Sequence, residues 1–329
     1  MKKIFILLFA SVLVLSCTKD VELADTTADL TESISQYDAT NLGIYKGVFT
    51  TQGTMERGVV EINVIPGNYA TATILTVKGQ TITFKSSEII EEGMEINELK
   101  LEAIGFGETS FLFSTDLDGT NVIISRVMYN GKKAGMIAAH DTSLAPVVPI
   151  TGVLACDDCD AHPLMVTGDT GTFSLVFVGD GSAGDTVTAL ADVGVVVSTP
   201  GSQPGCAPLG SQMICDIFGG GTIGTNVIDW IGDHIYNTAD DCSEATGFWS
   251  LDSGNHGSFT GTFTSDTTCS GGGLAGDVPA TAIPITLGAE GDGCATPSNT
   301  ALLATDGHTD SGLPTACFGA VPDIYYSWT

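Results

Sequence analysis

Short apolar runs separated by tight-turn sequences fill residues 41–140 and restrict the fold more than any other feature. In GVVEINVI (58–65), apolar residues occupy every second position, which is the period of a half-buried strand. Joints such as Asn130-Gly131 carry the dipeptide that most strongly predicts a β-hairpin. We read residues 88–104, which Gly93 interrupts, as further strand pieces. The predicted strands are 43–49, 58–65, 68–77, 80–86, 110–115, 121–129 and 135–140.

The pattern continues in a second unit, so we predict an all-β chain of tandem antiparallel β-sandwich or barrel modules. The expected strands of residues 151–270 include 171–178, 185–198, 226–237 and 257–266. Residues 141–150 contain two prolines and predict a linker, and residues 271–277 predict a glycine-rich one. A third module is expected to start at residue 278.

Eight of the nine cysteines lie after Lys133, which predicts a disulfide-stapled region in an exported protein. Cys206 and Cys215 flank a Pro/Gly loop, which indicates a stapled hairpin. Cys242 and Cys269 bracket two predicted strands. Cys294 and Cys317 both lie in the third module and most simply pair with each other, which leaves Cys156 with Cys159.

The stretch ACDDCDAHP (155–163) also allows two other interpretations. A zinc site would use Cys156, Cys159, His162 and a fourth ligand such as His234 or an aspartate. A redox pair is disfavoured, because neighbouring aspartates raise the pKa of a thiol and no strand-to-helix pattern surrounds the pair. Disulfide formation remains the preferred interpretation.

The N-terminus has the layout of an export signal. Two lysines precede an apolar run of signal-peptide length, which ends at Ser16-Cys17. The sequence Val-Leu-Ser-Cys resembles the lipobox of bacterial lipoproteins. That resemblance implies a signal peptide over residues 1–16, acylation of Cys17, and an acidic tether over residues 17–40. The expected location is the outer membrane or cell surface, with the lipid as the membrane contact.

Two further stretches resemble secreted proteins of Bacteroidota. The first consists of AIPITLG (282–288), Cys294, Cys317 and PDIYYSWT (322–329). Together they resemble the start of a β-sandwich domain similar to pre-peptidase C-terminal domains. Residues 41–270 are similar to modular regions of flavobacterial surface proteins. The chain ends in a run with strand propensity, so we expect that more protein follows residue 329.

Charge is distributed unevenly along the chain. All 11 Lys and Arg residues lie at or before Lys133, whereas 22 acidic residues follow it. This excludes nucleic acid as a partner, because phosphate neutralisation needs Lys and Arg. The sequence demands no cofactor, although its acidic loops would suit Ca²⁺. The candidate Ca²⁺ ligands are Asp116, Asp118, Asp157, Asp158, Asp160, Asp180 and Asp185.

No recognised catalytic motif occurs, so the function we expect is non-enzymatic. His234, which follows Asp233, and His256 could each serve as a general base, but a structural role is the simpler interpretation of both. We expect adhesion, or binding of a surface protein or extracellular polysaccharide, with Trp230, Tyr236 and Trp249 as sugar-stacking candidates or core residues. The alternative is the accessory stalk of a secreted hydrolase whose catalytic domain lies beyond residue 329.

Overall fold

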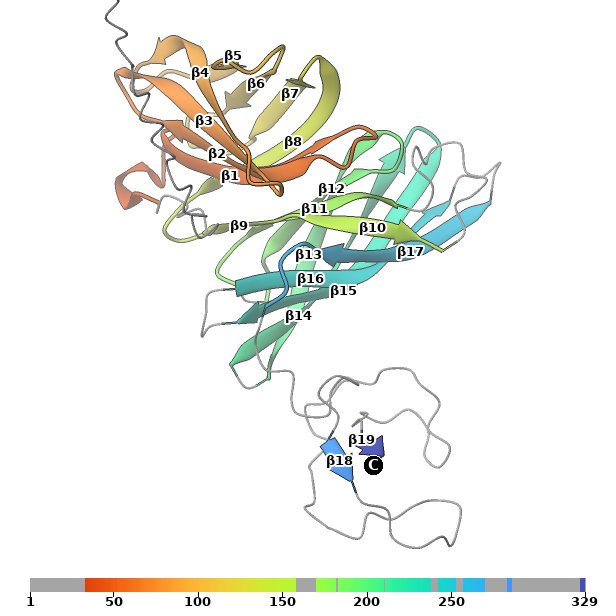
Figure 1. Ribbon diagram of the computed structural model, residues 1–329. Coiled ribbons are helices and arrows are strands. Elements are labelled where there is room, and N and C mark those ends of the chain that lie inside the picture. The colour runs from red at the N-terminus through yellow and green to blue at the C-terminus, as the bar shows by residue number, and fades with distance from the viewer. Residues whose placement is uncertain are drawn as a thin grey trace, which may run out of the picture. The chain divides into compact units, whose positions relative to one another are not determined.

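The computed structural model describes residues 33–157, 170–181, 183–209, 211–237, 242–252 and 257–269, and the backbone of 283–285 and 326–328. Most of these residues lie in antiparallel strands, which form two closed sheets in succession (Figure 1). This confirms the predicted all-β class with tandem modules.

The first closed sheet is an eight-stranded meander in which each strand pairs with the next and β1 pairs with β8. A short 3₁₀-helix, Ser35–Tyr37, precedes it. The strands are β1 Gly43–Thr51, β2 Arg57–Val64, β3 Asn68–Thr76, β4 Thr81–Ile90, β5 Ile96–Ala103, β6 Ser110–Thr115, β7 Ile123–Tyr129 and β8 Lys132–Asp141.

Alternating side chains fill the interior of this first barrel. In β2 every second residue is buried, as the sequence pattern predicts. Tyr45 meets Phe113 edge-on, with ring centroids 5.0 Å apart, in the middle of the core. Eight strands give an interior that side chains can fill, and here they do so.

The turn chemistry and the strand reading of residues 88–104 are also confirmed. Asn130 and Gly131 have φ of +49° and +76°, the left-handed pair that a type I′ hairpin turn requires. Gly93, with φ +78°, lies between the end of β4 and the start of β5. Residues 88–104 therefore contain the end of β4 and the whole of β5, joined by a glycine turn.

The second sheet contains nine strands and closes where β10 pairs with both β11 and β17. β9 lies beside the other half of β11, so β9 and β10 occupy one edge of that strand in sequence. The strands are β9 Val147–Ile150, β10 Gly152–Cys156, β11 Thr170–Val178, β12 Thr186–Asp192, β13 Val196–Leu209, β14 Gln212–Ile223, β15 Asn226–Asn237, β16 Cys242–Asp252 and β17 Ser258–Ser265.

Two elements differ from the sequence-based expectation. Residues 147–150, expected within a linker, instead form β9, which pairs with β11. This strand tolerates Pro149 because it pairs on one side, so that only one backbone N–H is missing. Residues 185–198, expected as one strand, form β12 and β13 around Gly194, which has φ +90°. The Asp192 carboxylate accepts the Gly194 N–H at 3.1 Å and stabilises that turn.

Two of the predicted disulfides are present. Cys206 and Cys215 face each other across β13 and β14, and Cys242 at the start of β16 pairs with Cys269 just after β17. Cys156 is also disulfide-bonded. Cys159, Cys294, Cys317 and Cys17 lie outside the described residues, so their predicted states stay predictions.

The two barrels share a contact through β1, which is buried along its whole length. One face of β1 lines the first core, and the other packs on the second barrel, where Val48 joins Val147, Val176 and Leu190 in an apolar cluster. The Thr50 and Thr172 hydroxyl oxygens are 2.6 Å apart across this junction.

Beyond the second barrel, the structure describes one parallel strand pair, β18 Ile283–Ile285 and β19 Tyr326–Trp328. Both lie inside stretches expected to be strands. The glycine-rich linker at 271–277 and the rest of the third module lie outside the described residues.

Candidate functional site

A groove of about 490 Å³ lies beside β7 and β8, where the first barrel is incompletely paired. β7 and β8 pair only at Met128–Lys133 and Tyr129–Lys132, next to their hairpin turn. The same register would continue through residues 122–127 and 134–139, and these are the residues that line the groove. The groove therefore lies where β7 and β8 run next to each other without pairing. We call this unpaired stretch, residues 122–127 and 134–139, the seam.

The opening has a local cause in β7. Arg126 has φ +50°, which a non-glycine residue rarely adopts. In the pairing with β6, Arg126 and Val127 together oppose the single residue Phe111, which makes a β-bulge. β7 stays with β6 beyond the bulge and leaves β8. Half of the backbone N–H and C=O groups of each strand consequently point into the seam without a ladder partner among the described residues.

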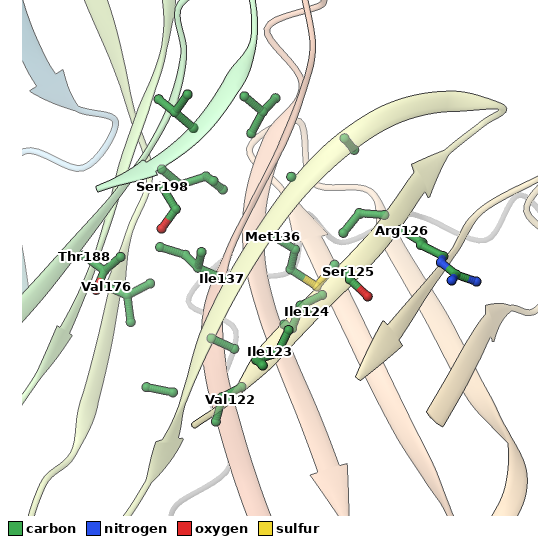
Figure 2. Close-up of a pocket in the computed structure, with 18 of the residues that line it drawn as sticks. Val122, Ile123, Ile124, Ser125, Arg126, Met136, Ile137, Val176, Thr188 and Ser198 are labelled. Atoms are coloured by element: carbon green, nitrogen blue, oxygen red, sulfur yellow. The ribbon is translucent and has the colours of Figure 1, made fainter. Parts of the chain in front are cut away.

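Side chains on the seam are mostly apolar. Val122, just before β7, Ile124 of β7, and Met136 and Ala138 of β8 pack on the core of the first barrel. Figure 2 shows Ile123, Ile124 and Ser125 on one strand and Met136 and Ile137 on the next, while Arg126 points away from the second barrel. The seam therefore offers an apolar floor and two polar backbone edges.

The second barrel supplies a further wall of the groove. Val176, Thr188 and Ser198, from β11, β12 and β13, lie across from Ile137 (Figure 2). Ile137 and Val178 also contact the apolar cluster that joins the barrels. The groove is thus continuous with the junction between the barrels.

An acidic recess of about 330 Å³ adjoins one end of the groove and shares Val122, Ala138 and Ala139 with it. Asp38 and Asp118 line this recess, and neither carboxylate forms an ion pair with Lys or Arg in the described part of the chain. The Ser143 hydroxyl lowers the pKa of Asp38, and the Thr120 hydroxyl, 2.7 Å from Asp118, lowers the pKa of that carboxyl. Both groups are therefore anionic at neutral pH.

His140 lines the same recess. Its ring stacks on Tyr45, with ring centroids 4.7 Å apart. Burial lowers the pKa of His140, so the imidazole is neutral at neutral pH and does not offset the two aspartates. The recess therefore has a net negative charge.

The candidate Ca²⁺ ligands that the structure describes do not converge. Within the described residues, no group of three or more His, Cys, Asp or Glu side chains is arranged to hold a metal ion. Asp116 and Asp118 accept hydrogen bonds within their own hairpin, and Asp185 accepts the Gly181 N–H at 2.8 Å across the β11–β12 loop that also contains Asp180. Asp157 follows β10, and Asp158 and Asp160 lie outside the described ranges.

The stacking candidates are mostly core residues. Trp230 and Trp249 are each 2% exposed, and their indole N–H groups donate to Thr199 and to the Ala155 carbonyl. Tyr236 is half-buried. Alternation along β15 and β16 turns both tryptophans into the second barrel, so neither ring face is open to a sugar.

The exposed apolar side chains of this barrel come from the other face of the same strands. Phe218, Ile231 and Phe248 are direct cross-strand neighbours on β14, β15 and β16, and each is substantially exposed. Sequence reasoning missed this row because it ranked aromatic residues by type. The sequence did contain a signal for this row. Ile231 and Phe248 are each one position from a tryptophan, so alternation places them on the opposite face of the sheet.

Of the remaining zinc and base candidates, the structure describes Cys156 and His234, and these two form no site with each other. Cys156 is in a disulfide, and a disulfide sulfur is not a thiolate ligand. His234 is buried in the second barrel, with Nδ1 2.8 Å from Gln203 Oε1 and its ring stacked on Phe177. His162 and His256 lie outside the described residues.

Comparison with protein-family models, curated proteins and solved structures found no match. Among the residues that the structure describes, no helix is both long and apolar enough to cross a membrane.

Proposed function

We propose that the chain is a non-catalytic, lipid-anchored binding protein of the bacterial outer membrane or cell surface. We further propose that the groove beside β7 and β8 binds a segment of another protein. The observation that carries this proposal is the apolar groove of about 490 Å³ at the junction of two barrels. Its volume lies in the usual range for binding sites, and sites at domain junctions are common.

Protein is favoured over polysaccharide as the ligand of this groove. Its lining offers apolar side chains and strand edges, whereas sugars are bound by exposed aromatic faces and dense hydroxyl-directed polar groups. Confirmed disulfides support an exported location, because such bonds persist in oxidising compartments. The lipobox at Cys17 supports the anchor.

Polysaccharide binding is a second candidate, and a separate observation favours it. Phe218, Ile231 and Phe248 form an exposed apolar row on one sheet face, next to Asp216 and Asp233 on the neighbouring positions of β14 and β15. Aromatic rings beside carboxylates on an exposed sheet face suit stacking on sugar rings and recognition of their hydroxyl groups.

Filling the groove tests the first candidate. Ser198→Trp places a bulky ring on the exposed wall residue, and Ser202→Trp on the same strand, outside the groove lining, is the matched control. We expect the purified chain to adhere to immobilised extracellular proteins, and Ser198→Trp alone to weaken that adhesion. Equal adhesion of both variants contradicts the groove as the binding site. Glycan binding that is lost in Phe248→Ala supports the second candidate instead.

The anchor requires its own test. In a Gram-negative host, we expect the full chain to incorporate a palmitate analogue and to sediment with membranes, and Cys17→Ala to do neither. Equal labelling of the two chains contradicts acylation at Cys17.

A further inference from the structure

We infer that the seam between β7 and β8 binds an extended segment of a partner protein by strand addition, with apolar side chains on one face of the segment and a basic residue at the end near Asp118. This inference deepens the proposed function and rests on it, because it names how the groove would hold a protein segment and which segment it would select.

The first step is the pairing deficit. β7 is paired on its other side with β6, and β8 with β1, so both strands are held in extended conformation. Six pairs that the hairpin register would add, from Val127–Ala134 to Val122–Ala139, are not formed. Backbone groups at a strand edge are strong hydrogen-bonding groups, and an added strand satisfies them.

The second step is the shape of the space. Closing the seam directly would require β7 to straighten at Arg126, where the bulge and φ of +50° hold it with β6. An inserted strand of about six residues, about 20 Å long, would instead pair with both edges. Because β7 and β8 are antiparallel, the inserted strand would run antiparallel to one and parallel to the other.

The third step is the side-chain pattern that the seam selects. One face of an inserted strand would lie over Val122, Ile124 and Met136, which border the first core. The opposite face would lie toward Ser198 and Thr188 of the second barrel. The segment should therefore alternate apolar residues with small or polar ones.

Charge identifies the end of the segment. The Val122–Ala139 end of the seam opens into the recess with Asp38 and Asp118, two carboxylates with lowered pKa values and no Lys or Arg partner among the described residues. The chain has no Lys or Arg after Lys133, so the second barrel provides no cation either. A Lys or Arg that leaves the seam at this end would meet unneutralised negative charge. A second copy of this chain, at a formal net charge of −28, would meet repulsion.

The probe is a fluorescent synthetic peptide of alternating valine and threonine that ends in two lysines. Its control has the same side chains and charge, with N-methyl groups on alternate backbone nitrogens. Fluorescence anisotropy with the full chain should show binding of the first peptide, and binding of the second that is weaker by at least about tenfold, because each methyl group removes a backbone donor.

Two variants at one position test the seam itself. Arg126→Gly and Arg126→Val remove the same charge, but glycine keeps the left-handed conformation and valine disfavours it. Arg126→Gly keeps the bulge and should bind the peptide more tightly than Arg126→Val. Arg126→Val should bind it several-fold less tightly, while amide exchange in residues 123–127 and 134–139 slows as the seam closes. If Arg126→Val does not fold, Asp118→Asn serves instead: it should weaken binding of the peptide that ends in two lysines, and leave unchanged the binding of a Val/Thr peptide that ends in two glutamines.

Several results would overturn strand addition. These are equal binding of the N-methylated peptide, no binding of either peptide, or slow amide exchange throughout residues 134–139 in the free protein. The proposed function would survive them if Ser198→Trp still weakened adhesion to proteins. It would fail separately if that substitution had no effect.

Discussion

Lys46 Nζ lies 2.8 Å from Asp141 Oδ2, and both side chains are almost completely buried where the two barrels meet. The other carboxylate oxygen of Asp141 accepts the backbone N–H of Val147 at 2.8 Å. Lys46 is on β1, Asp141 ends β8 and Val147 begins β9. One carboxylate therefore connects the last strand of the first barrel to the first strand of the second.

Removing the charge of Asp141 should strongly destabilise the folded chain, because it leaves the buried Lys46 ammonium unpaired. Asp141→Asn keeps an oxygen for Val147 but leaves the Lys46 ammonium buried without its counter-charge. We expect the free energy of unfolding in urea to fall by about 3 kcal/mol or more. The double variant Lys46→Met with Asp141→Asn removes the stranded charge and should recover part of that loss. Strictly additive losses would show that the two charges are not coupled.

The buried His234 should make the stability of the second barrel depend on pH. Burial lowers the pKa of His234 to about 4, whereas an unfolded histidine titrates near 6.5. Its Nε2 has no hydrogen-bond partner among the described residues. Below pH 6.5 the unfolded chain gains a proton that the folded chain does not, so stability is complete above that pH and is lost as the pH falls toward 4.

His234→Asn provides the measurement. Between pH 7 and pH 5, the wild type should lose about 2 kcal/mol more of its unfolding free energy than the variant does. The asparagine amide can still bond Gln203, which makes the comparison one of titration rather than of packing. Identical pH slopes would show that His234 is protonated equally in both states.

The sequence could predict most strands because their signals are local. Alternation of apolar and polar residues predicted β2, and Asn130-Gly131 predicted the β7–β8 hairpin. Cys206 and Cys215 predicted the disulfide-bonded hairpin of β13 and β14. The Asp192–Gly194 turn was missed because valines with high strand propensity flank Gly194 on both sides, at 193 and at 195–197. Local propensity cannot place a turn inside such a run unless the short Asp-x-Gly signal is given more weight.

The candidate site was not predictable in the same way. The seam depends on which neighbour β7 follows after Arg126, and that choice is made by packing between strands distant from the hairpin. One clue existed in the sequence, since Val122-Ile123-Ile124 breaks strict alternation and so places apolar side chains on both faces of the strand. The burial of Trp230 and Trp249 was likewise a matter of register, which a shift of one residue would have reversed.

The two described disulfides should differ in their contribution to stability. Cys206 and Cys215 are separated by 9 residues and Cys242 and Cys269 by 27, and a longer loop costs the unfolded chain more entropy to close. Replacing each pair with alanine should lower the free energy of unfolding by about 2–4 kcal/mol, and by about 1 kcal/mol more for Cys242–Cys269. Urea denaturation of the two double variants checks this order. A larger loss from the shorter loop would contradict the chain-entropy explanation.

Gly135 should be required for the close approach of β8 to the second barrel. A Cβ atom at this position would lie 2.1 Å from Val196 Cγ1 and 3.3 Å from Leu190 Cδ1, so an alanine must displace a short β-branched side chain. We expect Gly135→Ala to lower the free energy of unfolding by about 1–3 kcal/mol. Adding Val196→Ala should relieve the clash, so that the double variant is more stable than the sum of the two single losses predicts. Gly205→Ala is the matched control, since its Cβ would meet only Asp216 Oδ2 at 3.8 Å, and it should change stability by less than about 0.5 kcal/mol. A Gly135→Ala variant as stable as this control would mean that the barrels do not pack through Gly135 and Val196 in solution.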